Sequence, residues 1–326
     1  MDAPPNTATA VQQLQRVSSH AWLSFREYVR GGSPLPPRRA ALDRVVYGLA
    51  QPILGGRIIV RDVELLKAAL YPPLLLGVFC AAAALLDGGI DPGFFRRFYR
   101  VFAVLAPLPS IVFARHYARL AATAHRKLGF GDCEPRLEGI GRAVRRAVYQ
   151  AILIAIAAAP VVALLRLTPL LGRYLAQVAA ALWALHWVVI DAFDDARILE
   201  VGESLEDVDA KNRSSPTPWF IRCINWLGDR LPPGIRGLTR SFARFSDKLS
   251  LEWREEMALA EAHPSLVAGF GVMTAALLAT PALNLFFRPI IIVASVHLLG
   301  QVSRENGCLS RTDSRTPGRS DLHPGR

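Results

Sequence analysis

The sequence predicts an all-α fold: a polytopic membrane protein with two long transmembrane helices and two membrane-inserted helical hairpins. Of its 326 residues 52% are apolar, and the mean hydropathy of +0.26 is high for a soluble protein. The apolar residues form the uncharged blocks Ala68–Leu86, Ala147–Leu165, Tyr174–Ile190 and Pro264–Phe287. Crossing a bilayer takes roughly 20 apolar residues of helix, a length that two or three of these blocks reach.

The N-terminal residues 1–45 are rich in Pro, Ser and Arg, and they predict a disordered or weakly helical region with one short helix around Val11–Val29. The next segment, Asp43–Arg61, mixes apolar residues with glycines and a proline. It predicts a broken amphipathic segment lying on the membrane surface. A single membrane domain is expected over residues 46–303.

The first transmembrane span is expected at about 62–86. Asp62 is a candidate N-cap, and two prolines inside the segment predict a kink. A second span is expected at about 95–120, with Pro107 and Pro109 near its middle. Both spans are long enough to cross the bilayer.

Two helical hairpins are expected at about 142–193 and 264–302. In each, a Thr-Pro pair follows an apolar arm, and an arginine precedes or opens the second arm. Because proline cannot continue a helix, each Thr-Pro predicts a turn within the membrane. In the second hairpin, Pro281 is expected to end one arm and Pro289 to begin the next. The candidate pore or tip residues are Thr168, Pro169, Arg173, Thr280, Pro281, Asn284, Arg288 and Pro289.

The last arm, Pro289–Val302, is about 14 residues long, which is roughly 21 Å of helix and too short to cross a bilayer comfortably. An unpaired arginine at the bilayer midplane costs several kcal/mol. Arg288 is therefore expected either at the far headgroups or in a polar interior, with Asn284 as a possible polar partner. Hairpins that enter halfway and meet in a homo-oligomer would satisfy both requirements.

A polar insertion, residues 194–263, separates the hairpins. Its segment "WFIRCINWL" carries Trp219 and Trp226 and suits the level of the headgroups. The apolar residues of Ile235–Ala260 follow helical spacing and predict one amphipathic helix, which packs either on the protein or on lipid. After the last hairpin, residues 304–326 predict a disordered basic tail.

The formal net charge of +11 comes mostly from arginines beside the apolar blocks, where anionic headgroups would meet them. No aromatic-interleaved basic groove is visible, so nucleic acid is not an expected partner. The loops richest in arginine place both termini in the cytoplasm by the positive-inside rule. The composition is typical of a GC-rich genome and favours a bacterial inner membrane.

The sequence shows no nucleophile–base pair, phosphate-binding glycine loop or zinc-ligand spacing, so we expect no enzyme activity, catalytic residue, metal or cofactor. The cysteines form no CxxC pair. His186, Asp191 and Asp195 lie near one helix end. These residues could form a metal or proton-relay site, or they could be the solvated end of a helix that leaves the membrane; the sequence does not decide between the two.

Three stretches together resemble the CysZ-like / etoposide-induced protein 2.4 family of membrane proteins. They are "GGRIIVRDVELLKAALYPPLLL", "WVVIDAFDDARILEVGESLED" and "TPALNLFFRPIIIVAS", and the resemblance covers roughly residues 48–302. It implies two long transmembrane helices, two hairpins that enter the membrane partway, and oligomeric assembly. Its bacterial members are associated with sulfate uptake, so the resemblance implies a sulfate-type anion permease or channel.

In that family, sulfate is held near a Gly-Leu-Arg motif at a helix start. The matching positions here are Gly55, Gly56 and Arg57, with Arg61 one turn further on. Free N–H groups and guanidinium groups would favour an anion there, whereas lipid-headgroup anchoring is the alternative. Gly56 replaces the leucine, and Asp62 adds a negative charge; both departures weaken the match. The alternative function is a non-transporting membrane protein that acts through lipid or partner interactions.

Overall fold

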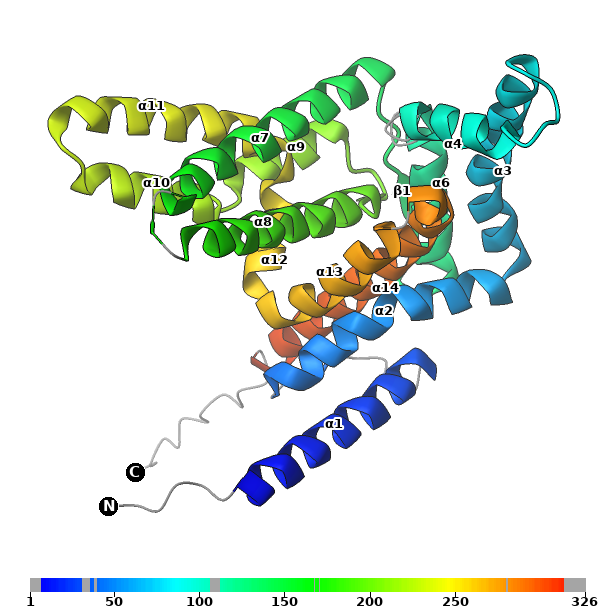
Figure 1. The fold of residues 1–326 in the computed structure, drawn as a ribbon. Helices are drawn as coiled ribbons and strands as arrows, with labels where there is room; N and C mark the ends of the chain where they lie inside the picture. Colours follow the sequence, from blue (N-terminus) through cyan, green and yellow to red (C-terminus); the bar gives the residue numbers. More distant parts are fainter. Residues whose placement is uncertain are drawn as a thin grey trace, which may run out of the picture.

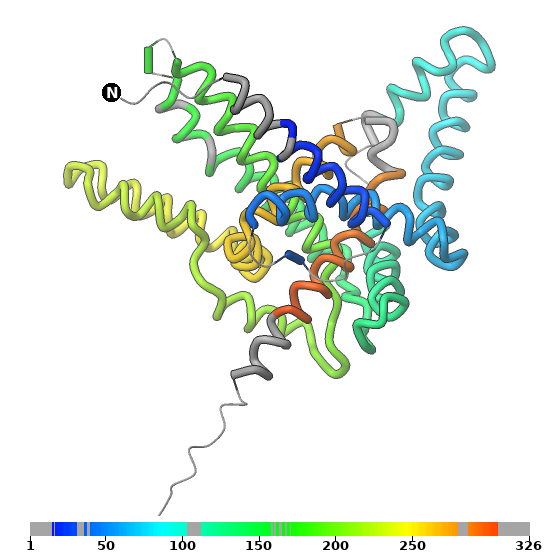
Figure 2. The backbone as a smooth tube through the Cα atoms, turned by 90° about the horizontal axis from the view of Figure 1, so that it is seen from below, coloured from blue at the N-terminus to red at the C-terminus, as the bar shows by residue number. Residues whose placement is uncertain are grey.

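The computed structural model describes residues 7–30, 36–37, 40–105, 112–166, 168–169, 171–279 and 281–313. These residues are almost wholly helical, which confirms the all-α class. Two short strands, β1 (Cys133–Pro135) and β2 (Ile198–Glu200), pair antiparallel. Figures 1 and 2 show a central group of helices from which arms extend on opposite sides.

The centre of the molecule is built from α2 (Ala41–Arg61), α13 (Pro264–Leu278) and α14 (Pro281–Asp313), which pack closely on one another. The N-terminal helix α1 (Thr7–Arg30) lies along α2 (Figure 1). The earliest and the latest helices of the chain therefore form one core.

Glycines allow this close packing of backbones. A Cβ atom added to Gly48 on α2 would lie 2.1 Å from the carbonyl oxygen of Leu266 on α13. A Cβ atom on Gly269 of α13 would lie 1.9 Å from the carbonyl oxygen of Val45. Small residues at such positions let two helices approach until their backbones touch.

The expectation of a broken surface segment over Asp43–Arg61 is wrong. Helix α2 continues through Pro52, and it buries residues along most of its length, including Tyr47, Ala50 and Ile59. Proline inside a helix costs about 3 kcal/mol, a cost that burial of this face offsets. The helix expected around Val11–Val29 is present as α1, which is longer than expected and spans Thr7–Arg30.

One arm contains α3 (Val63–Leu86) and α4 (Phe94–Leu105), which fold back against each other. Helix α6 (Ala114–Lys127) then returns the chain to the core, where Tyr117 is buried. Of the second span expected at 95–120, the structure describes α4 as far as Leu105 and α6 from Ala114 onward, so it does not test whether one helix joins them. Pro107 and Pro109 lie outside the described residues.

The opposite arm begins with the hairpin of α7 (Ile140–Arg166) and α8 (Gly172–Asp195), over nearly the range expected from the sequence. The insertion beside it contains further helices: α9 (Leu205–Ser214), α10 (Trp219–Arg230), α11 (Pro233–Ser250), a 3₁₀ turn (Leu251–Trp253) and α12 (Arg254–Ala262). The amphipathic helix expected over Ile235–Ala260 is thus divided at Ser250. Trp253 and Met257 follow the division and are fully buried in the core.

The second hairpin also differs from the prediction. Helix α13 ends at Leu278, and α14 begins at Pro281 and continues through Pro289. Pro289 therefore does not begin the second arm, and that arm is much longer than 14 residues. The same helix extends to Asp313, so the first part of the expected disordered tail is helical, while residues 314–326 lie outside the description.

Among the described helices, three are long and apolar enough to cross a membrane: Val63–Leu86, Gly172–Asp195 and Phe286–Glu305. A membrane protein is compatible with this finding.

Candidate functional site

The residues predicted to bind an anion do not lie at a helix start. Gly55, Gly56, Arg57 and Arg61 occupy the last turns of α2, where their amides lie within the helix. Gly55 instead lets α14 approach, because an added Cβ would lie 2.7 Å from the carbonyl oxygen of Ile290. The helix-start geometry on which the anion site was predicted is therefore absent at these residues.

The two arginines have separate surroundings. Arg57 donates a hydrogen bond to the carbonyl oxygen of Val29 over 3.1 Å, at the C-terminal end of α1. Arg61 is exposed. The adjacent helix start, that of α3, is capped by Asp62, whose carboxylate accepts from the amides of Glu64 and Leu65. A carboxylate thus occupies the position where a bound anion would have been expected.

The predicted residues of the first hairpin tip lie on the surface. Thr168, Pro169 and Arg173 are exposed at the turn between α7 and α8, and the carbonyl oxygen of Thr168 accepts from the amide of Gly172. Of the second tip, Thr280 and the side chains of Pro281 and Asn284 lie outside the description. Pro289 is buried within α14.

Arg288 is the predicted site residue that the structure places in a polar interior. Its Nη2 atom lies 2.7 Å from Oδ2 of Asp195 and 3.4 Å from Oδ2 of Asp191, both on α8. Its guanidinium carbon lies 5.8 Å from the ring centre of Tyr117 on α6. The site therefore joins three helices, α6, α8 and α14.

This contact also bears on how the hairpins lie. It sets the N-terminal part of α14, which is near the second hairpin's turn, beside the C-terminal end of α8, which is the base of the first hairpin. Two hairpins that entered the membrane from the same side to the same depth would have their turns side by side. Within this chain, the turn of the second hairpin lies near the base of the first instead.

A larger group of buried charges surrounds this site. Asp194 accepts hydrogen bonds from Arg136, at 2.9 Å, and from Arg146. Arg136 and Arg146 also pair with Glu138, at 2.7 and 2.9 Å. The group continues into the insertion through Arg142–Asp209, Arg145–Glu252, Arg146–Glu252, Arg197–Glu255 and Arg197–Glu256.

The strand pair brings these charges together. Pro135 of β1 lies opposite Ile198 of β2, which places Arg136 and Arg197 beside the end of α8. Helix α7 contributes Arg142 and Arg146, which are four residues apart and share a face. The charge group thus depends on contacts between segments that are distant in the sequence.

Two groups of the insertion show the effect of burial. Desolvation lowers the pKa of the Arg197 guanidinium, but the carboxylates of Glu256 and Glu255 outweigh it and raise that pKa above its ordinary value. Desolvation also raises the pKa of Glu256, against the influence of Arg197. An ion pair in such surroundings holds its geometry because an unpaired charge would be costly.

A small cavity of about 60 Å³ lies inside this charge group. Three guanidinium groups (Arg136, Arg146, Arg197) and three carboxyl groups (Glu138, Asp194, Asp195) line it. Its formal charges cancel when all are ionised, so it does not select an anion by charge. A polar cavity of this size is large enough to hold water.

Sequence reasoning singled out Arg288, Asp191 and Asp195 without joining them, and it missed Arg136 and Glu138. The arginines at 142 and 146 carried a signal, because like charges on one face of a helix need acidic partners elsewhere. Within the described part of the chain, no cluster of His, Cys, Asp and Glu could hold a metal ion. The arrangement holds helices together through charge.

Comparison of the chain with family models, with curated proteins and with solved structures found no match. The CysZ-like resemblance therefore stays a prediction, carried by the three sequence stretches alone.

Proposed function

We propose that the protein is an integral membrane protein that binds an anionic lipid surface through the hairpin of α10 and α11. The observation that carries this proposal is a row of exposed apolar side chains on both helices. They are Trp219, Trp226 and Leu227 on α10, and Ile235, Leu238 and Phe245 on α11. Apolar and aromatic residues on an amphipathic surface helix insert into the headgroup region.

The same hairpin is basic. Its arginines are Arg222, Arg230, Arg236, Arg240 and Arg244, and its acids are Asp229 and Asp247. The Arg230 guanidinium lies over the Trp226 ring, 3.7 Å from its centre, which places a cation beside an interfacial aromatic residue. Each basic residue near an anionic bilayer contributes about 1 kcal/mol of attraction.

Packing indicates where the neighbouring hairpin lies. Helix α10 contributes Trp219, Cys223 and Leu227 to a groove that α7 and α8 also line. Arginines are costly at the bilayer centre, so an arginine-rich helix at this level favours the headgroup region. The α7–α8 hairpin packs beside α10, so it would enter the headgroup region without crossing the bilayer. This agrees with the expectation of a hairpin that is only partly inserted.

The experiment uses the full protein in vesicles that contain phosphatidylglycerol brominated on its acyl chains. Trp226 is expected to be quenched, so the Trp226→Phe variant should lose part of the quenchable emission. Reversing charge at Arg240 and Arg244 to Glu should reduce Trp226 quenching at least twofold. The matched control places Glu at Arg96 and Arg100, which are exposed on α4.

Equal quenching in wild type and Trp226→Phe would contradict the proposal. So would unchanged quenching after charge reversal. A change in the control as large as that in α11 would show that net charge alone, rather than this hairpin, draws the protein to the lipid.

Sulfate-type permeation is the second candidate function, and the inward position of Arg288 favours it over a purely surface role. Vesicles containing the protein should then take up sulfate faster than empty vesicles. Arg288→Ala should lower that flux, because Arg288 is the candidate pore residue that lies in a polar interior. Flux equal to that of empty vesicles would remove this candidate without affecting the lipid-binding proposal.

A further inference from the structure

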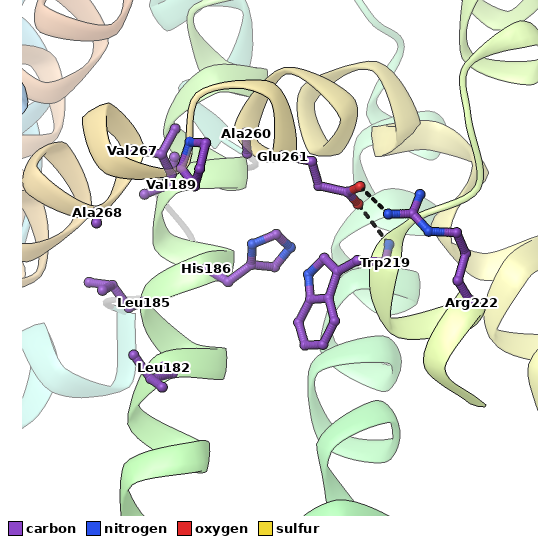
Figure 3. Close-up of a pocket in the computed structure, with 11 residues that line it drawn as sticks. Leu182, Leu185, His186, Val189, Trp219, Arg222, Ala260, Glu261, Val267 and Ala268 are labelled. Carbon is purple, nitrogen blue, oxygen red and sulfur yellow. Dashed lines mark hydrogen bonds and ion pairs between the residues drawn. The ribbon is translucent and has the colours of Figure 1, made fainter. Parts of the chain in front are cut away.

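A cavity of about 440 Å³ lies away from the charge group, between α8, α10, α12 and the start of α13 (Figure 3). Leu182, Leu185 and Val189 line it from α8, and Val267 and Ala268 line it from α13. Most of this wall is apolar. It has few polar groups, so their positions indicate which chemical class of ligand the cavity could bind.

His186 is the polar group inside the cavity, and it faces Trp219 across it (Figure 3). Its ring stacks on Trp183 at 5.8 Å and meets Trp219 edge-on at 6.4 Å. The Nε2 atom is buried and has no hydrogen-bond partner among the described residues. A buried polar atom without a partner is costly, and a ligand with a hydrogen-bonding group would remove that cost.

The charged groups at the rim neutralise each other. The Glu261 carboxylate accepts from Nη2 of Arg222 at 2.8 Å and from the amide of Trp219 at 2.7 Å. Arg222 also donates to the carbonyl oxygen of Thr217 at 2.6 Å. Because Arg222 and Glu261 pair with each other, the rim offers no free positive charge. The cavity therefore does not favour a carboxylate or phosphate head group.

An apolar groove of about 370 Å³ adjoins this cavity. The two share Leu182 and Trp219. The groove runs between α10 and the α7–α8 hairpin, where its wall includes Val161 and Ala179, and its described lining residues carry no charge. It also opens beside the exposed apolar face of α8, a helix apolar enough to span a membrane.

We propose that the cavity and groove bind one membrane amphiphile with an uncharged, oxygen-bearing head and a long hydrocarbon tail. The head lies beside His186, replaces the edge-on contact of Trp219 and forms a hydrogen bond with Nε2, while the tail follows the groove. The continuity of the groove with the α8 face argues for an occupant from the bilayer. The neutral rim argues against fatty acids and phospholipids.

The proposal rests on the membrane location of the α7–α8 hairpin and not on lipid binding by α11. The experiment therefore uses the full protein in nanodiscs of zwitterionic lipid, in which α11 meets no anionic surface. The probe is decylubiquinone, which has an uncharged carbonyl head and a decyl tail. Binding is read as saturable quenching of tryptophan fluorescence.

His186→Leu should weaken decylubiquinone binding about tenfold, because one buried hydrogen bond is lost. His186→Gln keeps a hydrogen-bonding group and should stay within about threefold of wild type. His20→Leu is the matched control, because His20 is an exposed histidine on α1 outside both cavities. It should bind as wild type does.

Two further measurements separate head from tail. Ala179→Phe should fill the groove and weaken decylubiquinone, but it should leave the same quinone without its decyl tail unaffected. Dodecanol should displace decylubiquinone, whereas laurate should not. Quenching that does not saturate, equal binding by His186→Leu and wild type, or displacement by laurate as strong as by dodecanol would each overturn the proposal.

Discussion

Helices α3 and α14 are both apolar enough to cross a membrane, yet the protein uses them differently. The 18-residue window within Val63–Leu86 is more apolar than that within Phe286–Glu305, yet only 28% of it is buried, against 61%. The more apolar helix is therefore the less covered one. Hydropathy measures how readily a helix leaves water, and it does not say whether lipid or protein receives it.

Small residues account for the difference. Ala294 on α14 packs where Gly55 of α2 leaves room, and Gly269 on α13 meets the backbone of α2. On α3, an added Cβ at Gly77 would meet nothing within 4 Å. Close backbone contact, rather than hydropathy, thus identifies the apolar helices that form the core.

The largest expected effect comes from Arg288, which pairs with two carboxylates of α8 near the start of the segment Phe286–Glu305. Arg288→Met leaves Asp191 and Asp195 without their cation, and we expect a loss of about 3 to 5 kcal/mol in unfolding free energy. The matched change Arg100→Met, on the exposed α4, should stay within about 0.5 kcal/mol. Thermal unfolding in detergent measures both.

A double variant tests the cause of that loss. Adding Asp195→Asn to Arg288→Met removes one unpaired charge and should recover part of the stability. If Arg288→Met lowers the unfolding free energy no more than Arg100→Met does, then water reaches the Arg288–Asp195 ion pair. In that case α14 is less buried than the contrast with α3 implies.

The next effect concerns glycine. Gly269→Ala would set a Cβ atom 1.9 Å from a carbonyl oxygen of α2, and we expect a loss of about 1 to 3 kcal/mol. Gly77→Ala meets no neighbour and should gain up to about 1 kcal/mol from helix propensity. Opposite signs in paired unfolding measurements would support the distinction between core and exposed arm, and equal losses would contradict it.

The smallest effect depends on pH at the joint between α12 and α13. Nδ1 of His263 lies 2.8 Å from Nη2 of Arg44 on α2, so this ring nitrogen accepts and the ring is neutral. Burial lowers the pKa of His263 below 6.5, Arg44 lowers it further, and Glu305 opposes both. The resulting stability is present above about pH 6.5 and is lost as the pH falls toward the lowered pKa.

Unfolding temperatures at pH 7.5 and pH 5 would measure this loss, which we expect to stay below about 1 kcal/mol. His263→Gln accepts from Arg44 without titrating, so it should show a smaller difference between the two pH values. A difference as large as that of wild type would place the titration at another group.

Local patterns predicted some elements well. The apolar blocks on either side of "RLTPLLGR" gave the α7–α8 hairpin within a few residues, and the segment with Trp219 and Trp226 forms the helix α10. The prolines were misleading at Pro52 and Pro289, where burial of the whole helix offsets a local cost of about 3 kcal/mol. Local patterns do not show how much a helix will bury.

The candidate site was harder to predict than the fold. Arg288 and Asp195 each stood out, but their pairing depends on how α14 crosses α8, which neither segment encodes alone. Arg136 and Glu138 lie in a short connection, and the pairing of β1 with β2 positions them. The helix start expected at Gly55–Arg57 is absent because α2 is one continuous helix, in which Gly55 allows α14 to pack closely.

The close contact between α2 and α13 also bears on synthesis. Gly269 follows Gly48 by 221 positions, and a ribosome adds about 5 to 20 residues per second. The surface of α2 around Gly48 is therefore synthesised roughly 10 to 40 s before α13, the helix that covers it. During that interval, lipid, an insertion factor or a second nascent chain must shelter this face, which makes it the vulnerable surface of the unfinished protein.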